Sequence, residues 1–102
     1  MSFFQQLFGS GQTEDLKTII EQGAFLVDVR TPAEFAEGSV HGAVNIPLDT
    51  VASQLSELKG KENIILFCRS GNRSGQAKVI LEQNGFKNVV NGGTLENVNQ
   101  FV

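Results

Sequence analysis

Short apolar stretches alternate with amphipathic ones along this chain, and that pattern is typical of an α/β protein. Segment 13–22 places Leu16, Ile19 and Ile20 on one helical face, which predicts a helix with one apolar side. The run 25–29 follows shortly after; it is rich in apolar and β-branched residues and therefore predicts a strand. A helix that leads into a strand is thus the first unit of the pattern.

The next unit has a marked helix start. Residues 31–34 read Thr-Pro-Ala-Glu, in which a capping threonine, a first-turn proline and a glutamate at the third position form a capping box. Residues 43–46 predict a second short strand, and Asp49 is placed to cap a helix over 49–58 whose apolar residues share one face. Strand and helix therefore alternate again.

Segment 63–67 (Asn-Ile-Ile-Leu-Phe) is the most continuously apolar strand candidate. Such a strand is typical of the centre of a parallel sheet, where both faces are covered. Beyond it we expect a helix over 74–84, a last strand over 88–91 and a closing helix from Leu95 onward. The whole order predicts an α/β fold, a parallel sheet with helices on both faces.

Length and composition indicate one folded domain. The chain has 102 residues with no repeat or linker, so we expect a single domain over 1–102, in which 1–12 is a more loosely attached segment. Hydrophobic residues make up 40% and charged residues 19%, which suits a chain that buries a core. A formal net charge of -3 with only eight lysines and arginines provides no basic surface, so nucleic acid is not expected as a partner.

The apolar runs also limit the cellular location. None approaches the ~20 residues that a membrane-spanning helix needs. The N-terminal residues carry no Lys or Arg before Lys17 and no sustained apolar region, so they do not resemble a signal peptide. We therefore expect a cytoplasmic protein with no membrane partner.

The chain has one cysteine, Cys68, which excludes an intramolecular disulfide and disfavours a cysteine-based metal site. Cys68 directly follows the buried strand, and the next six residues, 69–74, contain no proline and so keep every backbone N–H. Gly71 permits a tight curve that points several of these groups inward. A helix N-terminus near Ser74 and two arginines in the same loop would stabilise a thiolate. The alternative is that Cys68 is a small buried core residue.

Residues 67–74 (Phe-Cys-Arg-Ser-Gly-Asn-Arg-Ser) resemble the active-site loop of single-domain rhodaneses. Other motifs agree with that family in order and spacing: 26–30, 34–35, Gly38, 42–47 and 92–93. The resemblance implies a rhodanese-like fold, a five-stranded parallel sheet with flanking helices, and sulfur donors of the thiosulfate type. The sequence departs from the family pattern in two places. Ser39 and His41 stand where the family commonly has His and, two residues on, Pro, and no Trp follows the paired glycines.

The resemblance implies sulfurtransferase activity through a persulfide on Cys68. The acceptor would be an external thiol, cyanide or a partner protein, because the chain has no second cysteine, and no metal or organic cofactor is implied. The candidate substrate-binding residues are Arg69, Ser70, Gly71, Asn72, Arg73 and Ser74. We expect Arg69 to hold the anionic donor, with a solvated rim charge as the alternative.

Charged residues near the loop have candidate supporting roles. Arg73 either faces substrate or pairs inward with a carboxylate to hold the curve of the loop. Asp28 lies inside an apolar strand and therefore needs a partner, such as Arg30, Arg73 or backbone donors. Glu34 is interpreted as a helix cap with a second role as an ion-pair partner. We take Asp28 and Arg30 to support the site without taking part in the chemistry.

Two other functions compete with sulfur transfer. Related phosphatases and arsenate reductases also place a Cys at the head of an anion-binding loop, but with five residues between the Cys and an Arg; here four residues separate Cys68 from Arg73. The second rival is a binding module that has lost the chemistry. The intact Cys68 and its complete loop argue against that module.

Overall fold

The computed structural model describes residues 10–102, and a parallel sheet forms its centre. Its strands are β1 (Phe25–Asp28), β2 (Val44–Asn45), β3 (Ile64–Cys68) and β4 (Val89–Thr94). The spatial order is β2-β1-β3-β4, and every neighbouring pair is parallel. The predicted α/β fold is therefore confirmed, and the most apolar strand, β3, lies inside the sheet between β1 and β4.

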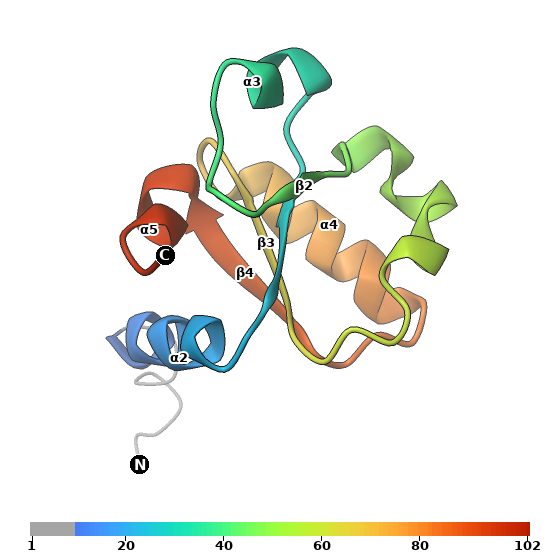
Figure 1. The fold of residues 1–102 in the computed structure, drawn as a ribbon. Coiled ribbons are helices and arrows are strands. Elements are labelled where there is room, and N and C mark those ends of the chain that lie inside the picture. The colour runs from blue at the N-terminus through green and yellow to red at the C-terminus, as the bar shows by residue number, and fades with distance from the viewer. Residues whose placement is uncertain (1–9) are drawn as a thin grey trace.

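Helices cover both faces of this sheet. The α-helices are α2 (Ser10–Glu21), α3 (Pro32–Ala36), α4 (Asn72–Gln83) and α5 (Leu95–Asn99). In Figure 1, α2 and α5 lie on one side of the strands, and α4 lies on the other. These α-helices and the strands match predicted ones, with ends shifted by up to three residues. Of the segment expected to attach loosely, 1–9 lie outside the described residues, and 10–12 belong to α2.

The expectation of five strands is wrong for the described residues, which form four. The number five came from the family resemblance, whereas the chain's own pattern contains only four short apolar stretches. Residues from Ser10 to the start of β1 build α2 and a turn, so this part of the chain adds no strand.

The helix expected over 49–58 is also wrong in type. The chain there forms two 3-10 helices, η1 (Leu48–Ser53) and η2 (Leu55–Glu57). Within η1 the Ser53 hydroxyl donates to the Thr50 carbonyl at 2.8 Å, and such local side-chain bonds compete with the regular α-helical ladder. Val51 and Leu58 are nevertheless fully buried, so the apolar face was correctly identified.

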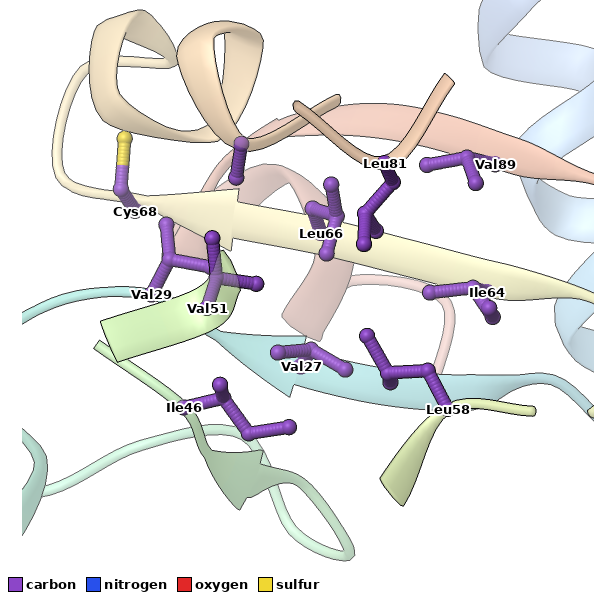
Figure 2. Close-up of a cluster of buried hydrophobic side chains, with 11 residues drawn as sticks. Val27, Val29, Ile46, Val51, Leu58, Ile64, Leu66, Cys68, Leu81 and Val89 are labelled. Atoms are coloured by element: carbon purple, nitrogen blue, oxygen red, sulfur yellow. The ribbon is translucent and has the colours of Figure 1, made fainter. Parts of the chain in front are cut away.

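The alternation of side chains along β3 divides the core into two layers. Ile64, Leu66 and Cys68 belong to the cluster on the α4 side (Figure 2), and Ile65 and Phe67 to the cluster beneath α2 and α5. All five side chains are fully buried. Burying a large aliphatic or aromatic side chain contributes about 1.5–3 kcal/mol, so β3 anchors both layers at once.

An irregularity in β4 lies beside the carboxyl end of β3. Leu66 pairs with Asn91 but Phe67 pairs with Gly93, so Gly92 is an extra residue on β4. Gly93 has φ +83°, a conformation that favours glycine. Bulges of this kind bend a strand and re-aim its side chains.

Gly92 is required for close packing at this bulge. A Cβ atom added there would lie 2.7 Å from Cγ2 of Val98 on α5 and 2.8 Å from Cγ2 of Ile65 on β3. Both neighbours are fully buried, so neither has free space to move into. The close approach of α5 to the sheet therefore depends on the absence of a side chain at this position.

We expect Gly92→Ala to lower the free energy of unfolding by about 1–3 kcal/mol, because overpacking forces the surrounding core to shift. Urea unfolding followed by circular dichroism measures this change. Gly75→Ala is the matched control: it lies within α4, its added Cβ would be an ordinary 3.4 Å from Asn91 Nδ2, and alanine is the better helix former. Unfolding of Gly92→Ala at the wild-type midpoint would contradict the packing argument.

Candidate active site

Cys68 is the last residue of β3 and lies at the carboxyl end of the sheet, as its sequence position predicts. Figure 2 shows its sulfur directed toward the loop that leads into α4, with Val29 and Val51 nearby. The residue is 0% exposed, so it is covered and does not project into solvent. Cys68 thus belongs to the apolar core, and its sulfur is also the atom around which the loop is built.

The loop that follows Cys68 curves around its sulfur atom. The N–H groups of Gly71 and Ser74 donate to Sγ at 3.1 and 3.4 Å, and Ser74 Oγ lies 3.5 Å from Sγ. Gly71 has φ +91°, which permits this tight curve. The Asn72 N–H donates to Ser70 Oγ at 3.3 Å, outside the cradle. Several of the six N–H groups were expected to point inward, and those of Gly71 and Ser74 do so at hydrogen-bond distance from Sγ.

These contacts change the pKa of the Cys68 thiol. Burial raises the pKa, while hydrogen bonds from the Ser74 side chain and from the backbone of Ser74, Ser70 and Gly71 lower it by more, so the net shift is downward. The first residue of α4 is Asn72, and the positive end of the helix dipole lies near the sulfur. The surroundings of Sγ therefore stabilise the thiolate more than water does for an ordinary cysteine.

Arg73 pairs with Glu34, one of the two arrangements left open by the sequence. Its Nη1 lies 2.8 Å from Glu34 Oε1 and its Nη2 3.2 Å from Oε2, which joins α4 to α3. Glu34 also completes the predicted capping box, because the Thr31 N–H donates to Oε1 at 2.9 Å. Hydrogen bonds from Arg73 and Thr31 lower the pKa of Glu34 to about 2.

Arg69 lies at the open rim of the loop. Its side chain is 71% exposed, and its Nη1 lies 3.8 Å from Glu34 Oε2. An exposed guanidinium beside Cys68 is free to contact an anion, while its long-range pair with Glu34 is weak. This position suits both roles considered for Arg69, a contact for an anionic donor and a solvated charge at the rim.

Asp28 and Arg30 form a buried ion pair behind the loop. Arg30 Nε donates to both carboxylate oxygens of Asp28, at 2.9 and 3.0 Å, and Nη2 donates to Oδ2 at 2.7 Å. The Arg30 N–H and the Ser39 hydroxyl add further bonds to Asp28 at 3.0 and 2.7 Å. Hydrogen bonding to Asp28 raises the pKa of Arg30. The partner expected for the buried carboxylate is therefore Arg30, with Ser39 as an additional donor.

Sequence reasoning missed three polar residues around the site: Ser39, Asn45 and Asn91. Asn45 Nδ2 donates to the carbonyls of Asp28 and Arg30, and Asn91 Oδ1 accepts from the Ser74 hydroxyl at 2.7 Å. Asn91 had one available signal, because it precedes the paired glycines in a strand that ends beside Cys68. Ser39 was noted only as a departure from the family pattern, and His41, the other departure, is exposed.

Comparisons with known proteins now identify the fold and the family. A family model described as a rhodanese-like domain matches residues 12–96. The chain belongs to the rhodanese-like family. The resemblance seen in the sequence is thereby confirmed, and the four-stranded sheet is a rhodanese-type α/β fold.

Similar proteins include two curated relatives and a solved structure. A sulfurtransferase from Allochromatium vinosum is 39% identical over 70 residues, which cover 69% of this chain and 65% of the relative. The thiosulfate sulfurtransferase PspE of Escherichia coli is 36% identical over 74 residues, 71% of each chain. A rhodanese with anions from E. coli has 35% identity and a TM-score of 0.67, over 74% of this chain and 91% of that one. The match thus spans slightly less than two thirds of the first relative.

Two further findings concern the described part of this rhodanese-like chain. Residues 10–102 contain no group of His, Cys, Asp and Glu side chains that could hold a metal ion. Within the same range, no helix is long and apolar enough to span a bilayer.

We expect the link between α3 and α4 to weaken in acid. The lowered pKa of Glu34 means that its ionised form stabilises the fold at pH values above its ordinary 4.5, and that this contribution is lost as the pH falls toward 2. The stability difference between wild type and Glu34→Gln, measured by urea unfolding, should therefore be largest above pH 5 and shrink between about pH 4.5 and 2.

The control for that measurement is Glu37→Gln, which also removes one negative charge near α3. Glu37 forms no ion pair with another described residue. The role of the Glu34–Arg73 pair would be contradicted if the stability difference between wild type and Glu34→Gln did not change with pH. It would also be contradicted if Glu37→Gln showed the same change with pH.

Proposed function

We propose that this rhodanese-like sulfurtransferase moves a sulfane sulfur from thiosulfate or a similar anionic donor to a thiol, cyanide or protein acceptor through a persulfide on Cys68. One observation carries the proposal: the sulfur of the chain's single cysteine lies against the N–H groups of Gly71 and Ser74. The similarity to a sulfurtransferase and to a thiosulfate sulfurtransferase supports an activity of this kind. A cytoplasmic location remains a prediction.

The reaction has two balanced displacements at sulfur. The Cys68 thiolate attacks the outer sulfur of thiosulfate; the new S–S bond forms as the old one breaks, and sulfite leaves with the bonding electron pair. The acceptor, as a thiolate or cyanide ion, then attacks the outer sulfur of the persulfide and releases the Cys68 thiolate. Both displacements start from an anion, for which the lowered pKa of Cys68 is favourable, and neither changes the net charge.

The loop contributes to these steps through fixed electrostatics. N–H groups that already point at the sulfur stabilise a negative charge without reorganising, which is the usual basis of oxyanion-type catalysis. Arg69 lies at the exposed rim, and its guanidinium suits the oxygens of an incoming donor. Arg73, through its pair with Glu34, holds the first turn of α4 against α3.

Access to the sulfur is part of this mechanism. Cys68 is fully covered, whereas Arg69 and Ser70 next to it are exposed. The donor reaches Sγ when atoms of this exposed part of the loop move aside.

Phosphate chemistry is disfavoured by the geometry of Arg73. A loop that hydrolyses phosphate esters needs an arginine free to bind two oxygens of the phosphoryl group. Both terminal nitrogens of Arg73 are instead engaged by Glu34. The four-residue spacing from Cys68 to Arg73 points the same way, and assays with thiosulfate and an aryl phosphate compare the two activities directly.

We expect thiosulfate treatment, followed by removal of excess reagent, to add the mass of one sulfur atom to the protein, and dithiothreitol to remove it. Intact mass spectrometry measures the adduct. Cys68→Ser is the control, because a hydroxyl has nearly the same shape but cannot form the persulfide. If no adduct forms with any of several sulfane donors, the binding-module alternative is the better interpretation.

We expect Arg69→Ala to raise KM for thiosulfate about tenfold, since one charge-assisted hydrogen bond of ~1.5 kcal/mol would be lost. Steady-state kinetics with cyanide as acceptor test this. Lys87→Ala provides the matched loss of one positive charge away from the loop and should leave KM unchanged. An unaltered KM in Arg69→Ala would return Arg69 to the role of a solvated rim charge.

A further inference from the structure

Asn91 lies on β4, one residue before the bulge at Gly92, and its side chain makes three hydrogen bonds beside the loop. Its Oδ1 accepts from the Ser74 hydroxyl at 2.7 Å and from the Gly93 N–H at 2.9 Å. Its Nδ2 donates to the Gly71 carbonyl at 3.2 Å. The Gly93 N–H can only donate and the Gly71 carbonyl can only accept, so these two backbone groups determine which way the amide faces.

The orientation of this amide determines where the Ser74 hydroxyl proton lies. The carbonyl oxygen Oδ1 has no hydrogen, so the proton in the 2.7 Å contact belongs to Ser74. A hydroxyl has a single proton, and Ser74 Oγ therefore presents only lone pairs to Cys68 Sγ, 3.5 Å away. Ser74 is fully buried, which leaves no solvent to supply another donor. In this arrangement a thiol proton on Cys68 is the natural donor to Ser74 Oγ.

The ionised sulfur requires the opposite arrangement. A thiolate has no proton to donate and is stabilised by a hydroxyl that donates to it. The Ser74 hydroxyl can do this only by rotating its O–H bond away from Asn91. No proton is transferred in this rotation; the same O–H bond changes its acceptor.

We propose that Asn91 is a positioning residue that holds the Ser74 hydroxyl proton away from the Cys68 sulfur until that sulfur carries a negative charge. The hydrogen bonds of the Asn91 side chain go to Ser74, Gly71 and Gly93 and not to the sulfur, so it acts through Ser74. Its relevance to sulfur transfer rests on the proposed function of Cys68. The consequence is that Ser74 and Asn91 have opposite effects: Ser74 favours the thiolate, and Asn91 competes with the thiolate for the same proton.

Charged residues also lie on the elements around Cys68. They come from β1 and the residues after it, from α3, from η1, and from the loop with α4: Asp28, Arg30, Glu34, Asp49, Arg69 and Arg73. Asp28 is paired with Arg30 and Glu34 with Arg73. Glu34 has a pKa of about 2, and pairing with Glu34 raises the pKa of Arg73, so this pair keeps its charges while the thiol titrates.

The chain is well suited to a direct measurement of the thiol. It has one cysteine, no tyrosine and no tryptophan, so the ultraviolet absorbance band of a thiolate belongs to Cys68 alone and is not overlaid by ionising tyrosine. The pH dependence of this band gives the pKa of Cys68 without any sulfur transfer. Failure of this inference is therefore distinguishable from failure of the proposed function, which the persulfide mass tests.

We expect Asn91→Leu to lower the pKa of Cys68, with the thiolate-to-thiol ratio at a given pH rising about three- to tenfold, because the hydroxyl is then free to donate to sulfur. Ser74→Ala should raise the pKa by a similar amount. In Ser74→Ala/Asn91→Leu, the pKa should equal that of Ser74→Ala alone, since Asn91 has no hydroxyl left to act on.

A merely structural role of Asn91 gives a different result. Loss of its bond to the Gly71 carbonyl would loosen the Gly71 N–H from the sulfur, raise the pKa, and do so in the Ser74→Ala background as well. A raised pKa in Asn91→Leu, or an effect of Asn91→Leu that persists in the Ser74→Ala background, would overturn the proposal. Asn97→Leu is the matched control, because Asn97 Nδ2 donates to the Gly92 carbonyl at 2.7 Å in the same part of β4 and has no bond to Ser74; it should leave the pKa unchanged.

Asn91→Ala is measured beside Asn91→Leu, because it removes the same amide atoms without adding an apolar side chain next to the Gly71 carbonyl. Circular dichroism and urea unfolding establish which variants are folded. A rise or no change in the pKa of a folded Asn91 variant overturns the proposal, and a fall that disappears in the Ser74→Ala background supports it.

Discussion

The structure around Cys68 depends on one balance, between the burial of its sulfur atom and the hydrogen bonds that the loop makes to it. Burial alone raises the pKa of Cys68, and the hydrogen bonds around Sγ outweigh it. Three features of the chain serve this end: the left-handed conformation of Gly71, the start of α4 at Asn72, and the Ser74 side chain. Each of them lies within six residues of the cysteine, so the local sequence builds most of the cradle.

The second level of the site consists of two ion pairs that join elements distant in the chain. Glu34 with Arg73 connects α3 to α4, and Asp28 with Arg30 closes the end of β1. Removing one partner of a buried pair such as Asp28–Arg30 leaves an uncompensated charge, which costs about 3–5 kcal/mol. Ser39 donates to the same carboxylate, so a position that departs from the usual family pattern has a clear structural use here.

The bulge in β4 connects packing to chemistry. Gly92 lets α5 approach the sheet closely, and the residue before it, Asn91, lies on the face that α4 covers. From there its amide reaches both the loop, at the Gly71 carbonyl, and α4, at the Ser74 hydroxyl. The geometry of the bulge and the direction of one hydroxyl proton are therefore linked in this protein.

The sequence by itself determined the alternation of strands and helices, the central place of β3, the capping box at Thr31 and the tight curve of the loop after Cys68. These follow from short-range rules: side-chain periodicity, capping, and backbone N–H groups near a glycine. It did not determine the 3-10 form of 48–57, because local hydroxyl bonds there compete with an apolar pattern that suits either helix type.

Only the tertiary structure decided which polar groups meet. Glu34 and Arg73 are 39 residues apart, and Ser74 and Asn91 are 17 apart, so their pairing depends on how β1, β3 and β4 align in the sheet. The sequence offered several partners for Asp28 and two roles for Arg73, and no short-range rule distinguishes among them. The physical reason is that hydrogen bonds and ion pairs require side chains to converge within about 3 Å, a condition set by strand register and helix packing rather than by residue type.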